Sequence, residues 1–230
     1  MRIVHVSDRR FPPASSEGGA PQCLASLVYE QRRVGHEVAV ATTATPRAQG
    51  VWRLNSVQEG EQRLLAKLQQ SRVDVVHFHA HAAAMQSAVQ AAGFPSVAHM
   101  HSNHLGRATD VMNGIYVSQR HAELHEGSVY IHNGVDVTTI PFTATATDHL
   151  AFLGKVKRSK KGASTALSVA RRTGRTLILI GGRKLSIPQS WLPWWKGVKA
   201  MGILRGKKKF TALGSASALL FPIRWEEPFG

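Results

Sequence analysis

Six histidines of this sequence stand at the ends of two apolar runs, a position from which side chains can act on a ligand. They are His77, His79 and His81 in and after the run that begins at Val73, and His99, His101 and His104 in and after the run that begins at Ser96. Alternate residues of a strand point to one side of a sheet, so His77 and His79 could together bind a metal such as zinc. No fixed pattern of Asp or Glu accompanies them, and a neutral imidazole can equally hydrogen-bond a sugar hydroxyl or a phosphate oxygen. We therefore assign no metal and expect packing to explain most of these histidines, with one or two acting on a ligand.

A glycine pair, Gly18-Gly19, stands between the N-terminal apolar run and a helical pattern that begins near Pro21. Glycine lets backbone N–H groups approach an anion closely, and the helix N-terminus that follows adds a favourable dipole. A tight turn would use the same residues, so both interpretations stand. The pair is not part of a G-x-G-x-x-G fingerprint, which argues against a simple dinucleotide-dependent dehydrogenase.

Charge is divided unevenly along the chain. Residues 1–145 hold 12 Lys and Arg against 11 Asp and Glu, whereas residues 146–230 hold 17 against 3. No acidic residue occurs between Asp148 and Glu226. Such a surface attracts polyanions. It fits either a solvated basic face that helps to bind a diphosphate or a contact with nucleic acid or anionic lipid headgroups.

Apolar runs and amphipathic stretches alternate along the chain, which predicts strands and helices in alternation. Strands are expected at Arg2–Ser7, His36–Ala41, Val73–Phe78, Ser96–Met100, Gly114–Val117, Val129–Ile131, Leu150–Leu153, Thr176–Ile180, Val198–Met201 and Ala218–Phe221. Helices are expected from Pro21 to Gly35 and at Glu59–Gln70, Ala82–Ala92, Gly162–Arg172 and Lys207–Ser215. Strands that are apolar on both faces indicate an α/β fold with parallel, doubly wound sheets.

A stretch of small residues, Thr143–Thr147, has the character of a linker. We place the domain boundary there, with an N-terminal Rossmann-like domain at residues 1–145 and a partial second one at residues 146–230. In such domains ligands bind outside the carboxyl ends of the strands, so the expected ligand site is a cleft that both domains face.

The segment His132-Asn133-Gly134-Val135-Asp136 follows a predicted strand, and its Asn-Gly pair favours a turn. With this segment the chain resembles the retaining glycosyltransferases of family 4. That family has an N-terminal strand and glycine pair, an Asp-Val-Val-His-x-His strand, an Asn-Gly-Val-Asp segment and a C-terminal Glu-x-Phe-Gly motif, and this sequence contains all four in that order. The resemblance extends from Met1 to Gly230 and implies the GT-B fold, in which two Rossmann-like domains face a cleft.

The resemblance also implies roles for individual residues. Gly18 and Gly19 match the family's loop near the donor phosphates and the reacting sugar, and His101 matches a histidine close to that sugar. The segment from Gly154-Lys155 to Lys161-Gly162 matches the one whose two cations hold the diphosphate. Lys155 stands where arginine is usual, so a point charge replaces a guanidinium fork. An exposed basic turn without a ligand is the alternative for this segment.

The C-terminal motif implies a catalytic role for Glu227, the first of two glutamates that the family places eight positions apart. The second would fall at position 235, beyond the printed sequence. In the family that glutamate faces the nucleotide ribose, and further strands and helices follow it. We therefore expect a second domain that lacks its last part.

The reaction implied is transfer of a sugar from a nucleotide diphosphate sugar to an acceptor hydroxyl, with retained anomeric configuration and without a metal or other cofactor. Lys155, Lys161 and a helix N-terminus would neutralise charge on the leaving diphosphate. Two alternatives stay open. One is a non-catalytic remnant that binds nucleotide or polyanion, and the other is a glycosyltransferase whose acceptor is nucleic acid, which the basic second part motivates.

Apolar runs and cysteine content indicate where the protein works. No run approaches the ~20 residues that a membrane helix needs, and Met1–Val6 is too short for a signal peptide. The single cysteine, Cys23, forms no internal disulfide and fits a reducing compartment. We expect a cytoplasmic protein, and the basic second part leaves peripheral attachment to an anionic membrane open.

Overall fold

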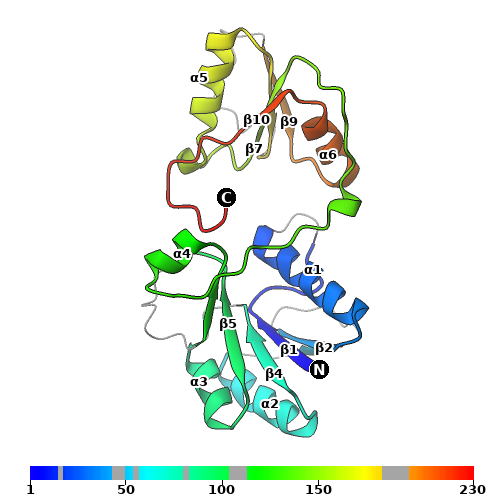
Figure 1. Ribbon diagram of the computed structural model, residues 1–230, viewed down its shortest axis with the longest axis vertical. Coiled ribbons are helices and arrows are strands. Elements are labelled where there is room, and N and C mark those ends of the chain that lie inside the picture. The colour runs from blue at the N-terminus through cyan, green and yellow to red at the C-terminus, as the bar shows by residue number, and fades with distance from the viewer. Residues whose placement is uncertain (15–17, 43–49, 54–56, 80–82, 104–112, 183–196) are drawn as a thin grey trace. The chain divides into compact units, whose positions relative to one another are not determined.

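The computed structural model describes residues 1–14, 18–42, 50–53, 57–79, 83–103, 113–182 and 197–230. The chain divides into two compact units (Figure 1). The first contains Met1–Val135 together with Glu227–Gly230, and the second contains Asp136–Glu226. The stretch Thr143–Thr147, to which the sequence assigned the domain boundary, lies within the second unit, where the N–H of Thr147 donates to the carbonyl of Ser215 at 2.8 Å.

The first unit contains a six-stranded parallel sheet with the order β3-β2-β1-β4-β5-β6. Its strands are β1 (Arg2–Ser7), β2 (Glu37–Thr42), β3 (Val51–Arg53), β4 (Val75–Phe78), β5 (Ser96–Met100) and β6 (Gly114–Tyr116). Its helices are α1 (Gly19–Arg33), α2 (Val57–Gln70), α3 (Ala83–Ala91) and α4 (Gln119–Leu124). The strand order reverses between β1 and β4, and in doubly wound sheets ligands bind outside the carboxyl ends of the strands at such a reversal.

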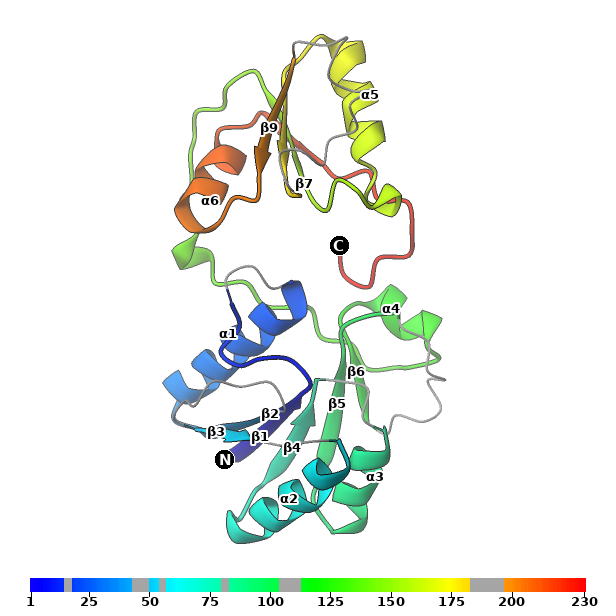
Figure 2. The same ribbon diagram turned by 180° about the vertical axis from the view of Figure 1, so that it is seen from behind.

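Side chains of the first sheet alternate between two helical layers, as the strand period requires. On one face Ile3, Val38 and Val40 pack with Leu24 and Val28 of α1. The opposite face packs against α2 and α3, through Val4, Val6, Val76, Phe78, Ala98, Leu64, Leu68 and Val89. Both views show α1 on one side of this sheet and α2 with α3 on the other (Figures 1 and 2).

The second unit contains a four-stranded parallel sheet with the order β10-β7-β8-β9. Its elements are β7 (Leu150–Leu153), α5 (Ala163–Thr173), β8 (Leu177–Ile180), β9 (Val198–Gly202), α6 (Gly206–Gly214) and β10 (Ala218–Leu220), with 3-10 turns η2 (Val137–Thr139) and η3 (Ser159–Lys161). Helices α5 and α6 cover opposite faces (Figures 1 and 2). The strand order reverses between β7 and β10, which is the corresponding ligand position.

The observed elements confirm the predicted α/β fold with parallel, doubly wound sheets, and most boundaries agree within one or two residues. Two local expectations were wrong, and two elements were missed. The strand expected at Val129–Ile131 is a single bridge from Tyr130 to Tyr116. The Asn133-Gly134 pair forms no hydrogen-bonded turn. Strand β3 and helix α4 were not predicted.

None of the described helices combines the length and the apolar character that a bilayer span requires.

Candidate functional site

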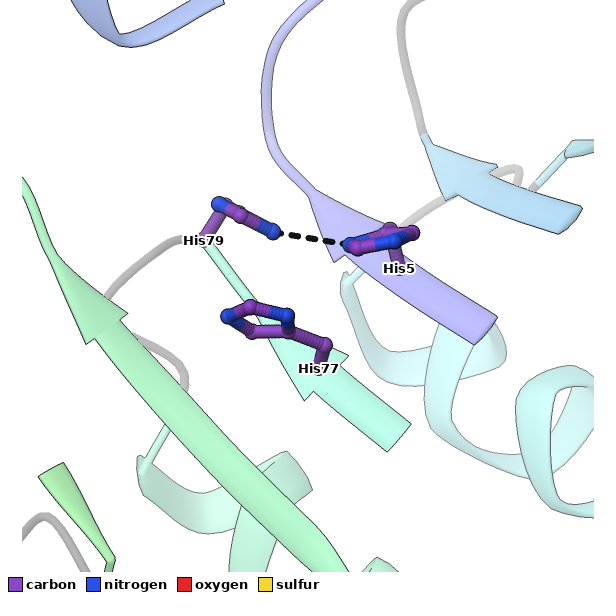
Figure 3. Close-up of side chains that lie close together, drawn as sticks. All are labelled: His5, His77 and His79. Atoms are coloured by element: carbon purple, nitrogen blue, oxygen red, sulfur yellow. Dashed lines mark hydrogen bonds between the residues drawn. The ribbon is translucent and has the colours of Figure 1, made fainter. Parts of the chain in front are cut away.

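Five histidines lie together at the carboxyl ends of β1, β4 and β5 in the first unit. His77 is in register with His5 on the neighbouring strand. His79, His99 and His101 continue the same face of the sheet by the alternation of strand side chains, and successive rings lie 4.2 to 5.6 Å apart between centroids. Figure 3 shows His79 and His77 at the end of β4, with His79 pointing at His5. These histidines lie on the face of the sheet that α1 covers. They lie at and next to β1 and β4, the two strands between which the strand order reverses.

Three hydrogen bonds join α1 to the end of β5 through these rings. Nε2 of His5 lies 2.7 Å from Oε1 of Gln31, Nδ1 of His5 lies 2.9 Å from Nε2 of His79, and Nδ1 of His79 lies 3.0 Å from Nε2 of His101. The amide oxygen of Gln31 can only accept, so His5 donates to it. A neutral imidazole has one donor and one acceptor, hence His79 donates to His5 and His101 donates to His79. Nδ1 of His101 is left as an acceptor.

Burial keeps these histidines uncharged at neutral pH. It lowers the pKa of His5 and of His99 to about 4 and that of His101 to about 3. Burial is also the first cause of the lowered pKa of His77 and of His79, and the neighbouring imidazoles lower both further. The group can therefore exchange hydrogen bonds with a neutral or anionic ligand without itself carrying charge.

A pocket of about 160 Å³ opens beside these rings. It is lined by Cys23, Leu27, His77, His79, His99, His101, Ile115, Ile131, His132, Asn133 and Gly134. The predicted site residue His101 and the Asn-Gly segment thus share one cavity, although they come from different parts of the chain. The Asn-Gly segment serves as a pocket wall rather than as a turn.

The last residues of the chain adjoin this pocket wall. The hydroxyl of Ser118 donates to the carbonyl oxygen of Pro228 at 2.5 Å, and the ring of Phe229 lies 5.8 Å from that of pocket-lining His132 between centroids. Glu227 precedes them, is partly buried and belongs to the same unit as His101.

Gly18 and Gly19 stand at the start of α1, the helix that supplies Cys23 and Leu27 to the pocket. Gly18 is the N-cap, with no side-chain hydrogen bond to the cap. A Cβ atom at either glycine would meet nothing within 4 Å. Neither glycine is therefore required by packing among the described residues. The described lining of the pocket does not include the two glycines themselves.

The second unit carries the predicted basic segment directly after β7. The N–H of Gly154 donates to the carbonyl oxygen of Ile180 at 2.9 Å. A Cβ atom on Gly154 would lie 3.8 Å from Cβ of Lys161, so the two ends of the segment lie side by side. Lys155 is exposed on the loop between them. The segment ends in η3 and in Gly162, whose φ of +76° starts α5.

The N-terminus of α5 lacks a side-chain cap, so its first N–H groups are available to an anion. Cationic groups surround it. The guanidinium group of Arg224, a residue that follows β10, donates a hydrogen bond to the hydroxyl of Thr165. The backbone N–H of Arg224 donates to the carbonyl oxygen of Lys160 at 2.9 Å. Nζ of Lys160 lies 3.7 Å from the ring centroid of Trp225, and Nζ of Lys161 lies 5.6 Å from it. The segments that follow β7 and β10, the strands between which the order reverses, thus form one cluster of cationic side chains around Trp225.

The predicted site residues are divided between the two units. His101 and Glu227 belong to the first unit, with Gly18 and Gly19, whereas Gly154, Lys155 and Lys161 belong to the second. Residues that the sequence interpretation missed are His5, Gln31, Arg224 and Trp225. His5 could have been found, because it occupies an inward position of the first predicted strand. Two of the six histidines of the sequence interpretation, His81 and His104, lie outside the described residues.

Two sets of described histidines have the proximity to hold a metal ion. His5, His77 and His79 form one set, and His79, His99 and His101 form the other, with the potential ligand nitrogens of each set within 4.8 Å of one another.

No protein-family model matches the chain, and no curated protein matches it in sequence. Solved structures do match it. AviGT4, a glycosyltransferase involved in avilamycin A biosynthesis, is 21% identical, with a TM-score of 0.70 over 99% of this chain and 73% of its own. Sucrose-phosphate synthase from Thermosynechococcus elongatus is 14% identical, with a TM-score of 0.76 over 100% of this chain and 77% of its own.

The catalytic domain of starch synthase IV from Arabidopsis thaliana, solved with ADP and acarbose bound, is 13% identical, with a TM-score of 0.66 over 99% of this chain and 79% of its own. The chain therefore has the GT-B fold of these glycosyltransferases, as its sequence motifs implied.

Proposed function

We propose that the protein transfers a sugar from a nucleotide diphosphate sugar to an acceptor hydroxyl, with retention of the anomeric configuration and without a metal in the transfer step. The observation that carries the proposal is the group of cationic side chains around the open N-terminus of α5. Lys160, Lys161 and Arg224 meet there at the strand-order reversal of a doubly wound sheet. That is where such sheets bind phosphate groups.

The diphosphate would be held by charge and by backbone N–H groups. Lys161 sits one residue before Gly162, the N-cap of α5, which makes no side-chain hydrogen bond to the first N–H groups of the helix. Lys155 is exposed on the same loop. When the bond to the sugar breaks, negative charge grows on the diphosphate, and fixed positive groups stabilise that charge without having to reorient.

The sugar would be held by the histidine pocket of the first unit. Nδ1 of His101 remains as an acceptor at the end of the chain of hydrogen bonds from Gln31, so it suits a sugar hydroxyl. Asn133 offers amide groups in the same pocket. We assign Glu227 to the catalytic machinery and Gly18 and Gly19 to the loop near the donor phosphates, on the match of these residues to the family 4 motifs.

The fold supports the proposal in a general way. The three similar structures are glycosyltransferases, and the starch synthase was solved with a nucleoside diphosphate. The identities of 13 to 21% extend only to the fold, so the donor base, the sugar and the acceptor do not follow from them.

Calorimetric titration with ADP, UDP and GDP tests the diphosphate site. We expect one of them to bind, and Lys161→Ala to weaken it by about tenfold or more, because a charge-assisted hydrogen bond contributes roughly 1.5–3 kcal/mol. Lys157→Ala is the matched control, since Lys157 is an exposed lysine of the same segment without a place at the α5 N-terminus. Equal affinity for the wild-type chain and the Lys161 variant would contradict the assignment.

A further inference from the structure

We propose that His79, His99 and His101 form a binding site for one divalent transition-metal ion of the zinc type in the first unit. Their potential ligand nitrogens lie within 4.8 Å of one another. Imidazole nitrogens bind zinc at about 2.0–2.1 Å, which in a tetrahedral site places them roughly 3.4 Å apart. Small rotations of the three side chains are therefore enough to surround an ion.

The first argument is that His79 already has the hydrogen bonding of a metal ligand. Its Nε2 lies 2.9 Å from Nδ1 of His5, and Nε2 of His5 lies 2.7 Å from Oε1 of Gln31. Because that oxygen only accepts, Nε2 of His5 donates to Gln31, and Nε2 of His79 donates to Nδ1 of His5. Nδ1 of His79 therefore presents a lone pair toward the set. Metal-binding histidines commonly donate their second ring N–H in this way, which fixes the tautomer.

The second argument comes from His99. Both of its ring nitrogens are buried and have no hydrogen-bond partner among the described residues. Leaving a buried polar group without a partner costs about 1–3 kcal/mol. Coordination through either nitrogen would satisfy that atom, and the ring already stacks on His101 at 4.3 Å between centroids. The site thus gives a physical role to a side chain that the proposed transfer reaction does not use.

The third argument is access. His79, His99 and His101 all line the 160 Å³ pocket, so an ion can enter and keep a position for water or another ligand. The other set, His5, His77 and His79, is less suitable because His5 is fully buried and is not part of the pocket lining. The two sets share His79, so one ion uses one of them. Coordination by His101 through Nε2 requires its ring proton to move to Nδ1, with no change in net charge.

One consequence rests on the proposed function, although the site itself does not. His101 is the residue that we assign to the donor sugar. An ion bound to it would occupy the sugar side of the pocket, so zinc and nucleotide sugar are expected to compete rather than to assist each other.

The experiment uses the full chain without a histidine tag, stripped with a chelator. ZnCl2 is titrated calorimetrically, and CoCl2 is added in parallel to record the visible absorption of a four-coordinate site. We expect one equivalent of each ion to bind. His99→Gln should lose this binding. Gln31→Met should weaken it by about 10- to 100-fold, because it removes the acceptor that orients His5 and His79.

His77→Gln is the matched control, since His77 belongs to the other set and not to this one. It should keep stoichiometric binding. Should His99→Gln fold poorly in chelator, as judged by thermal unfolding, His101→Asn replaces it with the same expected loss. Absence of saturable binding, or binding that survives the loss of His99 and of His101, overturns the site. Binding lost in His77→Gln and kept in His99→Gln would overturn the choice of ligands. None of these readouts uses a nucleotide, so they stand apart from the fate of the proposed function.

Discussion

The chemistry of the histidine pocket depends on imidazoles that stay neutral while packed against one another. Rings of His77 and His79 lie 4.2 Å apart between centroids, and those of His99 and His101 lie 4.3 Å apart. Two protonated rings at such distances would repel each other in a site that is largely buried. Burial and mutual proximity therefore set the pKa values, and these values make the pocket a set of hydrogen-bonding groups rather than a cationic patch.

Acid should destabilise the folded chain through these residues. An unfolded histidine takes up its proton near pH 6.5, whereas His5 and His99 do so near pH 4 in the folded chain. Below pH 6.5 the unfolded state binds more protons, so the free energy of unfolding decreases as the pH is lowered, by up to about 1.4 kcal/mol per pH unit for each such side chain. Urea unfolding from about pH 7.5 to 5, with a chelator present, measures this slope.

His5→Gln should show a shallower dependence, since one of the protons is no longer taken up on unfolding. A slope that is the same in the variant and in the wild-type chain would show that His5 titrates normally in the folded state.

Replacing His101 should impair turnover more than nucleotide binding. In His101→Ala the acceptor for the sugar is lost, whereas the cations of the second unit are unchanged. We expect kcat to fall about tenfold or more, the size of one hydrogen bond that acts in the transition state, with nucleoside diphosphate affinity within about twofold of wild type. His36→Ala, at a histidine outside the pocket lining, is the control. A loss of nucleotide affinity equal to the loss of kcat would contradict this division of roles.

At the scale of elements, the sequence predicted those that follow a repeating pattern. Apolar runs bounded by polar residues located β1, β4, β5 and β7, because nearly all residues of these strands are buried or half-buried. Helix α4 and strand β3 were missed since they are too short for a period to show. The hydroxyl of Ser118 accepts from the N–H of His121 and caps α4. Ala122 of α4 packs against Tyr116. Such elements depend on tertiary contacts that sequence spacing does not encode.

The turn from η3 into α5 requires glycine at position 162. Its φ is +76°, and a Cβ there would overlap the carbonyl oxygen of Pro222. Gly162→Ala should therefore lower the free energy of unfolding by about 2–4 kcal/mol, from left-handed strain of roughly 1–2 kcal/mol plus displacement of the segment after β10. Chemical denaturation of the full chain measures it.

Gly174→Ala separates the two causes. Gly174 ends the same helix with a φ of +66°, but a Cβ there would meet nothing within 4 Å. It should show the strain alone, about 1–2 kcal/mol. Equal losses in the two variants would mean that the contact with Pro222 contributes nothing.

At the scale of the whole molecule, each candidate group draws on residues far apart in the sequence. His5 and His79 meet because β1 and β4 are neighbours, and Lys160 meets Arg224 because β7 and β10 are. The family motifs located His101, Lys155 and Lys161, but they could not reveal Gln31 or Trp225, whose roles arise only from strand order. The motifs therefore supplied the residues that we assign to the reaction, whereas the residues that contact them were found only in the structure.

The excess of basic residues in the second unit should give salt-dependent binding to polyanions. Lys207 and Lys208 are exposed in the first turn of α6, which contains no acidic residue, so their charge adds to the positive end of the helix dipole. Affinity for duplex DNA should fall steeply with salt. Lys207→Gln with Lys208→Gln should reduce the slope of log K against log salt by up to about 2.

Arg171→Gln with Arg172→Gln is the matched control for this pair. It removes the same charge from the last turn of α5, where the helix dipole has the opposite sign, and its effect should be smaller. DNA binding that ignores salt, or that both double variants weaken equally, would argue against a phosphate site at α6.

The central claim is that the chain breaks the bond between a sugar and a nucleoside diphosphate. Incubation of the purified chain with a panel of nucleotide sugars, with release of nucleoside diphosphate followed by chromatography, tests it most directly. We predict release from at least one donor, at least slowly to water, and we expect release to be lost in Lys161→Ala and to decrease in His101→Ala. Nucleotide binding without release from any donor would contradict the claim and favour a chain that binds nucleotides without turning them over.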